Sequence, residues 1–435
     1  MIILIFILYL LIRIYPYIFS SIPLGYDPGL YLYLWQKYSE IPVFHFTKLS
    51  NWLIEVYPPL IAVVGKIGTI FFSPESLLIP FSFIASVLLF VSIYKYSKIE
   101  FDKKTSFWIL FLLTISAVQY KFWWWYYVKN ILAISFIFFY LYFDLIKSKW
   151  KWVFIPLVVL THQPTAIIFF IILIFKKKIN PILVFILTFV SYYLPNYETT
   201  IKPFLQSTVT TVGEASGTFY DLSEAMLLMI PYLPLTIYGI YLSIKRKTNK
   251  LIIKMTVISF LIPLFGLFLS RRFIPFFDLF AIILAGYGAS TFFAKNKKFI
   301  IIYIVISFIF MGEYIRDNSK PLILKDELNE IRLLSDTEEG SYILVADNEY
   351  TPWIYGYSNR KTIAPGFGEN DVYWRFNEWT KFWMSNNRNE EIKLLKKLPK
   401  PLYIYLGDNQ RQIRFKPVGS CFERYSLHVY KFVCN

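Results

Sequence analysis

The sequence predicts a polytopic α-helical membrane protein that carries a small α/β domain at its C-terminus. Of the 435 residues, 56% are apolar and only 17% are charged, whereas charged residues make up about 25% of a typical soluble domain. The mean hydropathy is +0.48. The apolar residues form runs of roughly 15–22, long enough for a helix to span the hydrocarbon core of a bilayer. From about Asn318 onward the composition becomes that of a soluble domain.

The apolar runs predict about eleven transmembrane helices. The first run lacks the basic start and the small-residue cleavage site of a signal peptide, so we expect it to be retained. The predicted helices are 1–19, 76–94, 105–120, 130–146, 152–163, 164–175, 180–195, 223–244, 251–269, 273–293 and 299–313.

Alternate connections between these helices are rich in lysine and arginine, and they predict the topology. The basic connections are 95–104, 147–151, 176–178, 245–250 and 295–298. Because positively charged loops stay in the cytoplasm, this alternation places the N-terminus inside the cell and the C-terminus outside. We therefore expect a multi-pass protein of the cell membrane with an extracytoplasmic C-terminal domain.

The formal net charge of +16 would suggest nucleic-acid binding in a soluble protein. Here the lysines and arginines lie mostly in the connections between apolar runs, where they determine topology. We therefore expect membrane lipids, and no nucleic acid, among the partners.

Three segments depart from a simple series of spans. The outer loop 20–75 contains a second apolar run, 57–72. A span there would place every later basic loop outside the cell, so this run predicts a helix at the membrane interface. Segments 152–163 and 164–175 are short for spans, and such interrupted pairs can line a cavity within the membrane. The outer loop 196–222 is polar and long enough to cover a site.

We place the domain boundary after residue 317, with a membrane domain at 1–317 and an extracytoplasmic domain at 318–435. Within the second domain, periodicity predicts helices and short buried strands in the order 326–334 (helix), 341–347 (strand), 389–397 (helix) and 402–406 (strand). Both cysteines of the chain, Cys421 and Cys434, fall here. Outside the cytoplasm they would form a disulfide, but two free thiols fit the sequence equally well.

The first outer loop opens with Gly25-Tyr26-Asp27-Pro28-Gly29, directly after the first predicted helix. A carboxylate at this membrane surface is a candidate general base, because partial burial raises its pKa and makes it a better proton acceptor. The alternative is a structural role, in which Asp27 caps a helix that begins at Pro28.

These features together resemble those of the integral-membrane GT-C glycosyltransferases. The resemblance rests on an N-terminal helix, on Asp27 in the first outer loop, on an aromatic-Pro-Pro-Leu helix start at 57–60, and on the segment SRRFIP at 270–275. Within this superfamily, the chain is similar in particular to the branch that contains protein O-mannosyltransferases and the aminoarabinose transferase of lipid A. Two positions depart from that branch: Tyr57 stands where histidine is usual, and Pro28 stands where many relatives carry a second acidic residue.

The resemblance implies that a sugar passes from a polyprenyl-phosphate donor to an extracytoplasmic glycan, lipid or protein acceptor, with inversion at the anomeric carbon. Asp27 would act as the general base, and cations near the membrane surface would neutralise the leaving phosphate. The candidates for phosphate binding are Arg271, Arg272 and Lys129. The candidates for contact with sugar or acceptor are Tyr26, Tyr57, His162, Glu214 and Asp221. The sequence assigns no metal ligands, although it is compatible with a divalent metal.

A purely structural role stays open for several of these residues, and two other classes of function stay open for the protein. The two arginines also fit headgroup contacts, His162 fits a satisfied core histidine, and Glu214 and Asp221 fit solvated loop carboxylates. A secondary transporter would explain the many helices and the broken pair at 152–175, but the helices contain no internal repeat. A non-catalytic membrane scaffold would explain Tyr57 and the missing second carboxylate.

Overall fold

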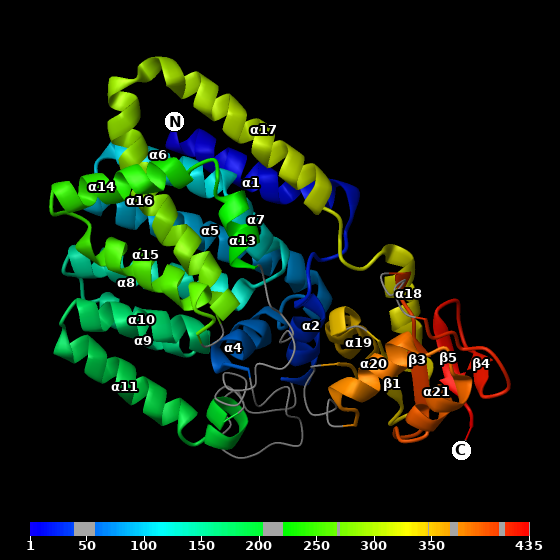
Figure 1. Ribbon diagram of the computed structural model, residues 1–435. Helices are drawn as coiled ribbons and strands as arrows, with labels where there is room; N and C mark the ends of the chain where they lie inside the picture. The colour runs from blue at the N-terminus through cyan, green and yellow to red at the C-terminus, as the bar shows by residue number, and fades with distance from the viewer. Residues whose placement is uncertain are drawn as a thin grey trace.

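The computed structural model describes residues 1–38, 57–202, 221–267, 270–346, 348–365, 373–408 and 414–434. Figure 1 shows a body of helices, built from residues up to Asn318, and a smaller unit with a β-sheet beside one end of it. The C-terminus lies in this smaller unit.

The helices of the body run side by side (Figure 1). They are α1 (Ile2–Phe19), α5 (Pro74–Glu100), α6 (Lys103–Ile115), α7 (Ala117–Trp124), α8 (Val128–Leu145), α9 (Lys151–Val159), α10 (Gln163–Phe175), α11 (Ile179–Tyr193), α13 (Leu222–Leu228), α14 (Leu233–Lys245), α15 (Lys250–Leu264), α16 (Ile274–Lys295) and α17 (Ile300–Asn318). Short helices complete the body: α2 (Pro28–Lys37), α4 (Pro59–Gly68), η1 (Tyr197–Ile201), η2 (Ser270–Phe273) and η3 (Lys297–Phe299).

Each predicted apolar segment overlaps one of these helices, but two segments predicted as single helices are broken. The segment 105–120 breaks at Ser116, whose hydroxyl accepts a hydrogen bond from the Gln119 amide at 3.1 Å and so caps a new helix. The segment 223–244 breaks over 229–232, next to Pro231 and Pro234, which lack the amide hydrogen that a continuous helix requires. The bends measure 53° and 91°.

Length and composition support fewer straight spans than the sequence predicts. Within the described ranges, five helices are long and apolar enough to cross a membrane, or up to seven if each bent pair forms one span. Three further apolar helices, 59–68, 163–175 and 179–193, are shorter. The prediction of eleven crossings therefore depends on short helices.

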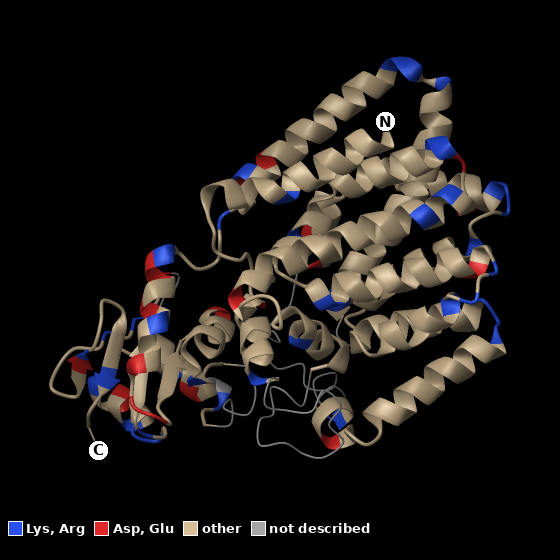
Figure 2. Ribbon diagram, turned by 180° about the vertical axis from the view of Figure 1, so that it is seen from behind, with Lys and Arg blue, Asp and Glu red and all other residues tan. Residues whose placement is uncertain are grey.

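The basic connections gather at the end of the body that lies away from the smaller unit (Figure 2). Asp144, near the end of α8, joins two of them. Its carboxylate binds Lys151 at 3.0 Å, Lys176 at 2.8 Å and Lys178 at 2.6 Å. The connections 147–151 and 176–178 consequently lie at the same end, as the predicted topology requires.

From residue 325 onward the chain forms a five-stranded sheet of order β2-β1-β3-β5-β4, in which β1 pairs in parallel with β2 and β3, and β5 pairs antiparallel with β3 and β4. The strands are β1 (Tyr342–Val345), β2 (Lys361–Ile363), β3 (Leu402–Tyr405), β4 (Phe422–Arg424) and β5 (Val429–Phe432). The helices are α18 (Lys325–Leu333), η4 (Leu334–Asp336), η5 (Asn348–Tyr350), α19 (Thr351–Ser358), α20 (Phe376–Met384) and α21 (Arg388–Leu395).

The two faces of the sheet belong to different cores because successive strand residues point to opposite sides. In β1, Ile343 and Val345 join a core that continues from the helical body. Leu344 joins a second core that contains Trp379 and Phe382. The sheet is therefore anchored to the body on one face and covered by α20 and α21 on the other.

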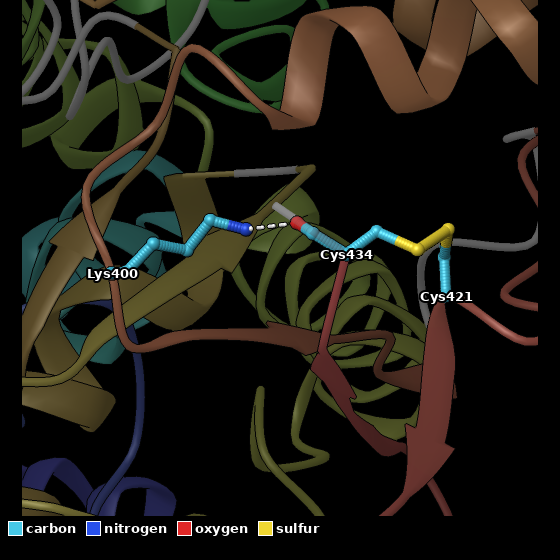
Figure 3. The surroundings of a disulfide bond; sticks show 3 residues. All are labelled: Lys400, Cys421 and Cys434. Atoms are coloured by element: carbon cyan, nitrogen blue, oxygen red, sulfur yellow. Dashed lines mark hydrogen bonds between the residues drawn. A yellow bond between two sulfur atoms is a disulfide. The ribbon is translucent and has the colours of Figure 1, made fainter.

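The last hairpin is closed by a disulfide between Cys421 and Cys434 (Figure 3). Cys421 precedes β4 and Cys434 follows β5, so the bond joins the open end of the hairpin. Lys400 donates a hydrogen bond from Nζ to the Cys434 carbonyl at 2.8 Å. Of the two alternatives that the sequence leaves open for these cysteines, the structure has the disulfide.

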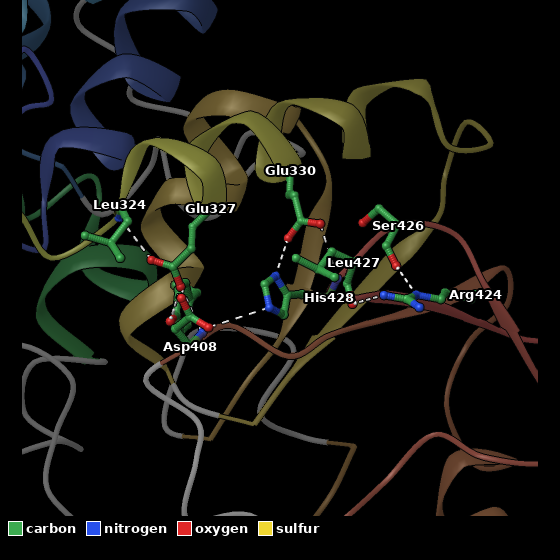
Figure 4. A network of polar contacts seen from close by, with 9 residues as sticks. Leu324, Glu327, Glu330, Asp408, Arg424, Ser426, Leu427 and His428 are labelled. Atoms are coloured by element: carbon green, nitrogen blue, oxygen red, sulfur yellow. Dashed lines mark hydrogen bonds and ion pairs between the residues drawn. The ribbon is translucent and has the colours of Figure 1, made fainter.

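Carboxylates of α18 fix that helix against the sheet (Figure 4). Glu327 accepts hydrogen bonds from the Tyr350 hydroxyl at 2.7 Å and the Asp408 amide at 2.9 Å. Glu330 binds the His428 ring at 2.5 Å and the His428 amide at 3.2 Å. These bonds tie α18 to the loop after β3 and to the start of β5.

Candidate functional site

Five of the predicted site residues lie at the N-terminal ends of helices. Asp27 precedes α2, Tyr57 lies just before α4, Lys129 is in the first turn of α8, His162 precedes α10, and Arg272 lies just before α16. Proline occupies the first or second position of α2, α4, α10 and α16. Proline is favoured there because its fixed φ suits a first turn that needs no donor. The unpaired N–H groups of converging helix starts favour anions.

Asp27 is the buried acid of this group, with 5% of its surface exposed. Burial raises the pKa of its carboxyl above the ordinary value, and the positive charges of Lys129 and Arg272 oppose that increase. Its backbone carbonyl accepts hydrogen bonds from the amides of Leu30 and Tyr31, at 3.0 and 3.2 Å, whereas its side chain makes no capping hydrogen bond. The side-chain capping bond that the alternative interpretation requires is therefore not made by Asp27.

A tight packing contact holds the segment before Asp27 in place. Gly25 has a φ of +82°, and a Cβ atom there would lie 2.3 Å from the carbonyl oxygen of Trp124. Only glycine adopts this conformation at such a distance without strain. The next residue, Tyr26, is buried, and its amide donates a hydrogen bond to the Trp125 carbonyl at 3.3 Å. The end of α7 thereby sets the position of Asp27.

Lys129 is fixed by two aromatic residues from other elements. Its amide donates a hydrogen bond to the Tyr31 hydroxyl of α2 at 3.0 Å. Its Nζ atom lies 4.2 Å from the centroid of the Tyr57 ring, in a cation–π contact. Since Asp27 opens α2, the bond to Tyr31 holds the start of α8 against that helix, and the Lys129 charge acts on the Asp27 carboxyl.

The remaining candidates have different surroundings. His162 is buried, its Nδ1 atom lies 2.8 Å from the Thr165 hydroxyl, and the charges of Lys129 and Arg272 reach its ring. Arg271 forms an ion pair with Asp221 at 2.7 Å. Glu214 lies outside the described residues.

The structure thus brings Asp27, Tyr57, Lys129 and His162 within reach of the Arg272 charge, with the Arg271–Asp221 pair beside Arg272. The sequence prediction omits Tyr31 and Tyr127. Tyr31 stands four residues after Asp27 on α2, and Tyr127 interacts with the charges of Asp27 and Arg272. The sequence signal for Tyr31 is its helical spacing from Asp27.

In the part of the chain that the structure describes, no group of three or more histidine, cysteine, aspartate or glutamate side chains could hold an ion. The charged groups that act on Asp27 are cations, which repel a divalent metal. The arrangement fits an anion such as a phosphate far better.

No family model and no curated protein matches the sequence. Solved structures do match. The oligosaccharyltransferase of Archaeoglobus fulgidus in its apo form has a TM-score of 0.64 at 13% identity, over 93% of this chain and 69% of that chain. The chain shares the fold of this archaeal enzyme, which is a GT-C fold. The likeness concerns the fold, and it does not single out the O-mannosyltransferase branch or the eleven crossings.

Two other structures of the archaeal enzyme contain ligands. One, tethered through a disulfide to an acceptor peptide with an NVT sequon, has a TM-score of 0.60 at 14% identity, over 93% of this chain and 68% of that chain. The other is in complex with an inhibitory peptide and a dolichol-phosphate. It has a TM-score of 0.54 at 13% identity, over 93% of this chain and 69% of that chain. At this level of identity the comparison establishes the fold alone.

Proposed function

We propose that this protein is a glycosyltransferase that moves a sugar or glycan from a lipid-phosphate donor to an acceptor outside the cytoplasm. One observation carries the proposal. In a GT-C fold, the buried Asp27 carboxylate lies close enough to Lys129 and Arg272 for their positive charges to act on it. A proton acceptor and a phosphate-binding pair are the two parts that such a transfer requires.

The proposed reaction is a single inverting displacement. The nucleophilic group of the acceptor loses its proton to the Asp27 carboxylate while it forms a bond to the anomeric carbon of the sugar. The bond between that carbon and the phosphate oxygen breaks, and the phosphate leaves with the electron pair. Arg272 and Lys129 neutralise the negative charge that develops on the leaving group. Arginine suits this task because its planar guanidinium binds phosphate through two hydrogen bonds.

The structural neighbours support the chemical class of both substrates. Since the archaeal enzyme binds a dolichol-phosphate and a peptide, we propose a polyprenyl-type phosphate donor and a peptide acceptor, with glycans and lipids as the alternatives. Tyr57, His162 and Tyr26 would contact the sugar or the acceptor.

The charge pattern supports the orientation. We propose that the basic end of the body (Figure 2) faces the cytoplasm and that the body crosses the membrane about eleven times, the short helices included. The site and the unit from residue 318 onward then face the outside, where a Cys421–Cys434 disulfide is stable.

Two measurements on the purified full-length protein test this proposal. Mass spectrometry of lipids that copurify should find a polyprenyl-type phosphate, and the mass of its headgroup identifies the sugar. Incubation with that lipid and a peptide library should then yield glycosylated peptide. Absence of both lipid and product, combined with gradient-driven uptake of a solute into proteoliposomes, would instead establish a transporter.

A further inference from the structure

A buried carboxyl group joins three elements of the helical body. Asp278 lies in α16 and is fully buried. Its Oδ2 atom accepts hydrogen bonds from Ser116 Oγ and Gln119 Nε2, both at 2.9 Å, and its Oδ1 atom accepts one from the Tyr232 hydroxyl. A carboxyl group within membrane helices is costly and generally marks a function.

Two of the three donors lie at breaks between helices, and the third, Gln119, lies in α7. Ser116 separates α6 from α7 at a bend of 53°, and Tyr232 ends the break between α13 and α14, which differ in direction by 91°. The continuous helix α16 passes both breaks. Asp278 therefore accepts the hydrogen bonds that hold both bends against the continuous helix α16.

Each bend leads to a part of the candidate site. Beyond the first bend, α7 ends at Trp124, whose carbonyl packs against Gly25 and so places Asp27. Before the second bend, α13 follows Asp221, which pairs with Arg271. These two helices contact each other at the end of the body near α2 (Figure 1).

The same network reaches the start of α16. Gln119 Nε2 donates a second hydrogen bond, to the Pro275 carbonyl at 2.9 Å. Pro275 lies in the first turn of α16, directly after the η2 turn that carries Arg272. The network around Asp278 thus fixes the segment that presents the arginines.

We propose that Asp278 is a positioning residue for the phosphate site: it holds the N-terminal end of α16, and with it Arg272, in register with the segment that carries Asp27. This inference rests on the function proposed above. Asp278 lies six residues beyond Arg272, roughly 9 Å along a helix. It acts through the helix and does not touch the substrate.

Binding of dolichyl phosphate to the full-length protein in detergent tests the proposal. Asp278→Leu removes the acceptor of three buried hydrogen bonds and should weaken binding roughly tenfold. Asp278→Asn keeps one acceptor oxygen and should recover most of the affinity. The matched control is Ser290→Ala, which removes another hydrogen bond between α6 and α16, from Thr105 at 2.8 Å, far from the arginines. It should bind like the wild type.

A double-mutant cycle separates positioning from general destabilisation. If Asp278 acts through Arg272, the loss in Asp278→Leu should not add to the loss in Arg272→Ala. Full additivity, or binding by Asp278→Leu equal to that of Ser290→Ala, would overturn the proposal. If Asp278→Leu fails to fold, Gln119→Leu carries the same expectations, because it removes the donor to both Asp278 and Pro275.

A second readout needs no lipid. The pair Asp221→Cys and Arg271→Cys should react with a short thiol cross-linker, and Asp278→Leu should lower the yield. An unchanged yield would overturn the positioning role. If Asp278→Leu lowers the yield but the protein with the native Arg271 binds no dolichyl phosphate, Asp278 positions this segment and the proposed function is wrong.

Discussion

Gly29 and Gly356 contact each other directly, backbone to backbone. A Cβ atom on Gly356 would lie 2.3 Å from the carbonyl oxygen of Gly29, and a Cβ atom on Gly29 would lie 2.0 Å from the Pro352 carbonyl oxygen. Gly29 belongs to α2, the helix that Asp27 opens, and Gly356 belongs to α19, beside the sheet. The C-terminal unit is therefore seated on the helix that carries the proposed base.

This contact predicts that Gly356→Ala disturbs both stability and catalysis. The added methyl group has no space, and overpacking of this kind costs about 1–3 kcal/mol. We expect a lower melting temperature and reduced transfer, because α2 must shift. The matched control is Gly312→Ala in α17, where a Cβ atom meets nothing within 4 Å. A Gly356→Ala protein that melts and transfers like the control would show that the two helices separate freely.

Asp27→Asn should abolish transfer without unfolding the protein. Asparagine keeps the size of the side chain but accepts no proton, and general-base contributions of about 10²–10⁴-fold correspond to roughly 3–5 kcal/mol in barrier height. Stability should change little because the Asp27 side chain makes no capping hydrogen bond. Asp326→Asn, an exposed substitution in α18, is the control. Retention of wild-type transfer rates by Asp27→Asn would remove this residue from the mechanism.

Arg272 should bind phosphate by its fork geometry as well as by its charge. Arg272→Ala should therefore weaken donor binding more than Arg272→Lys, which keeps the charge but not the paired donors. Arg246→Ala is the control, since this arginine binds the Tyr287 hydroxyl in a connection at the basic end of the body. Titration of each variant with dolichyl phosphate measures the effect, and equal affinities in Arg272→Ala and the wild type would contradict the assignment.

The proposed topology can be tested with single cysteines. Introduced at Lys103, Lys177 and Lys247, they should react with a membrane-impermeant maleimide only after the cytoplasmic side is opened. A cysteine at the exposed Glu339 should react in intact cells. The native cysteines are paired and stay silent without reductant. Labelling of the Glu339 position only from the cytoplasmic side would mean that the number of crossings is wrong by an odd number.

Much of the site is encoded in local sequence signals. Asp27-Pro28, Tyr57-Pro58-Pro59 and the arginines before Pro275 all mark helix starts, because proline at the first turn is a strong local preference. That these starts meet could only be expected from the family resemblance. Their meeting depends on long-range contacts, such as Gly25 against the Trp124 carbonyl, which no local pattern contains.

The fold was predictable where hydrophobic runs are long and less so where polar side chains act at a distance. Ser116 and Tyr232 stand inside apolar runs that predict continuous helices, but both donate to Asp278 at a break. Strands β2, β4 and β5 are three or four residues long and contain charged residues such as Lys361 and Arg424. Such strands form because a neighbouring strand pairs with them, and a short window does not reveal that partner.

The electrostatics of the site predict the pH dependence of transfer. Asp27 accepts a proton only when it is ionised, so kcat/KM should fall on the acid side as the pH drops through the pKa of this carboxyl. Burial raises that pKa above the ordinary value, while the charges of Lys129 and Arg272 lower it. The acid limb of the pH profile of kcat/KM, where the rate falls as the pH drops, should therefore lie above the pH at which an exposed aspartate titrates.

Removal of one of these cations should move the acid limb to higher pH. In Lys129→Met the ionised form of Asp27 loses a stabilising charge, its pKa rises, and a higher pH is needed to create the base. Lys254→Met removes a charge of the same sign that contacts Phe175 instead, and its acid limb should stay with that of the wild type. The position of the limb is independent of the overall rate, so weaker donor binding in Lys129→Met does not obscure the result. A limb that stays in place, or moves to lower pH, would show that Lys129 does not act on the catalytic carboxylate.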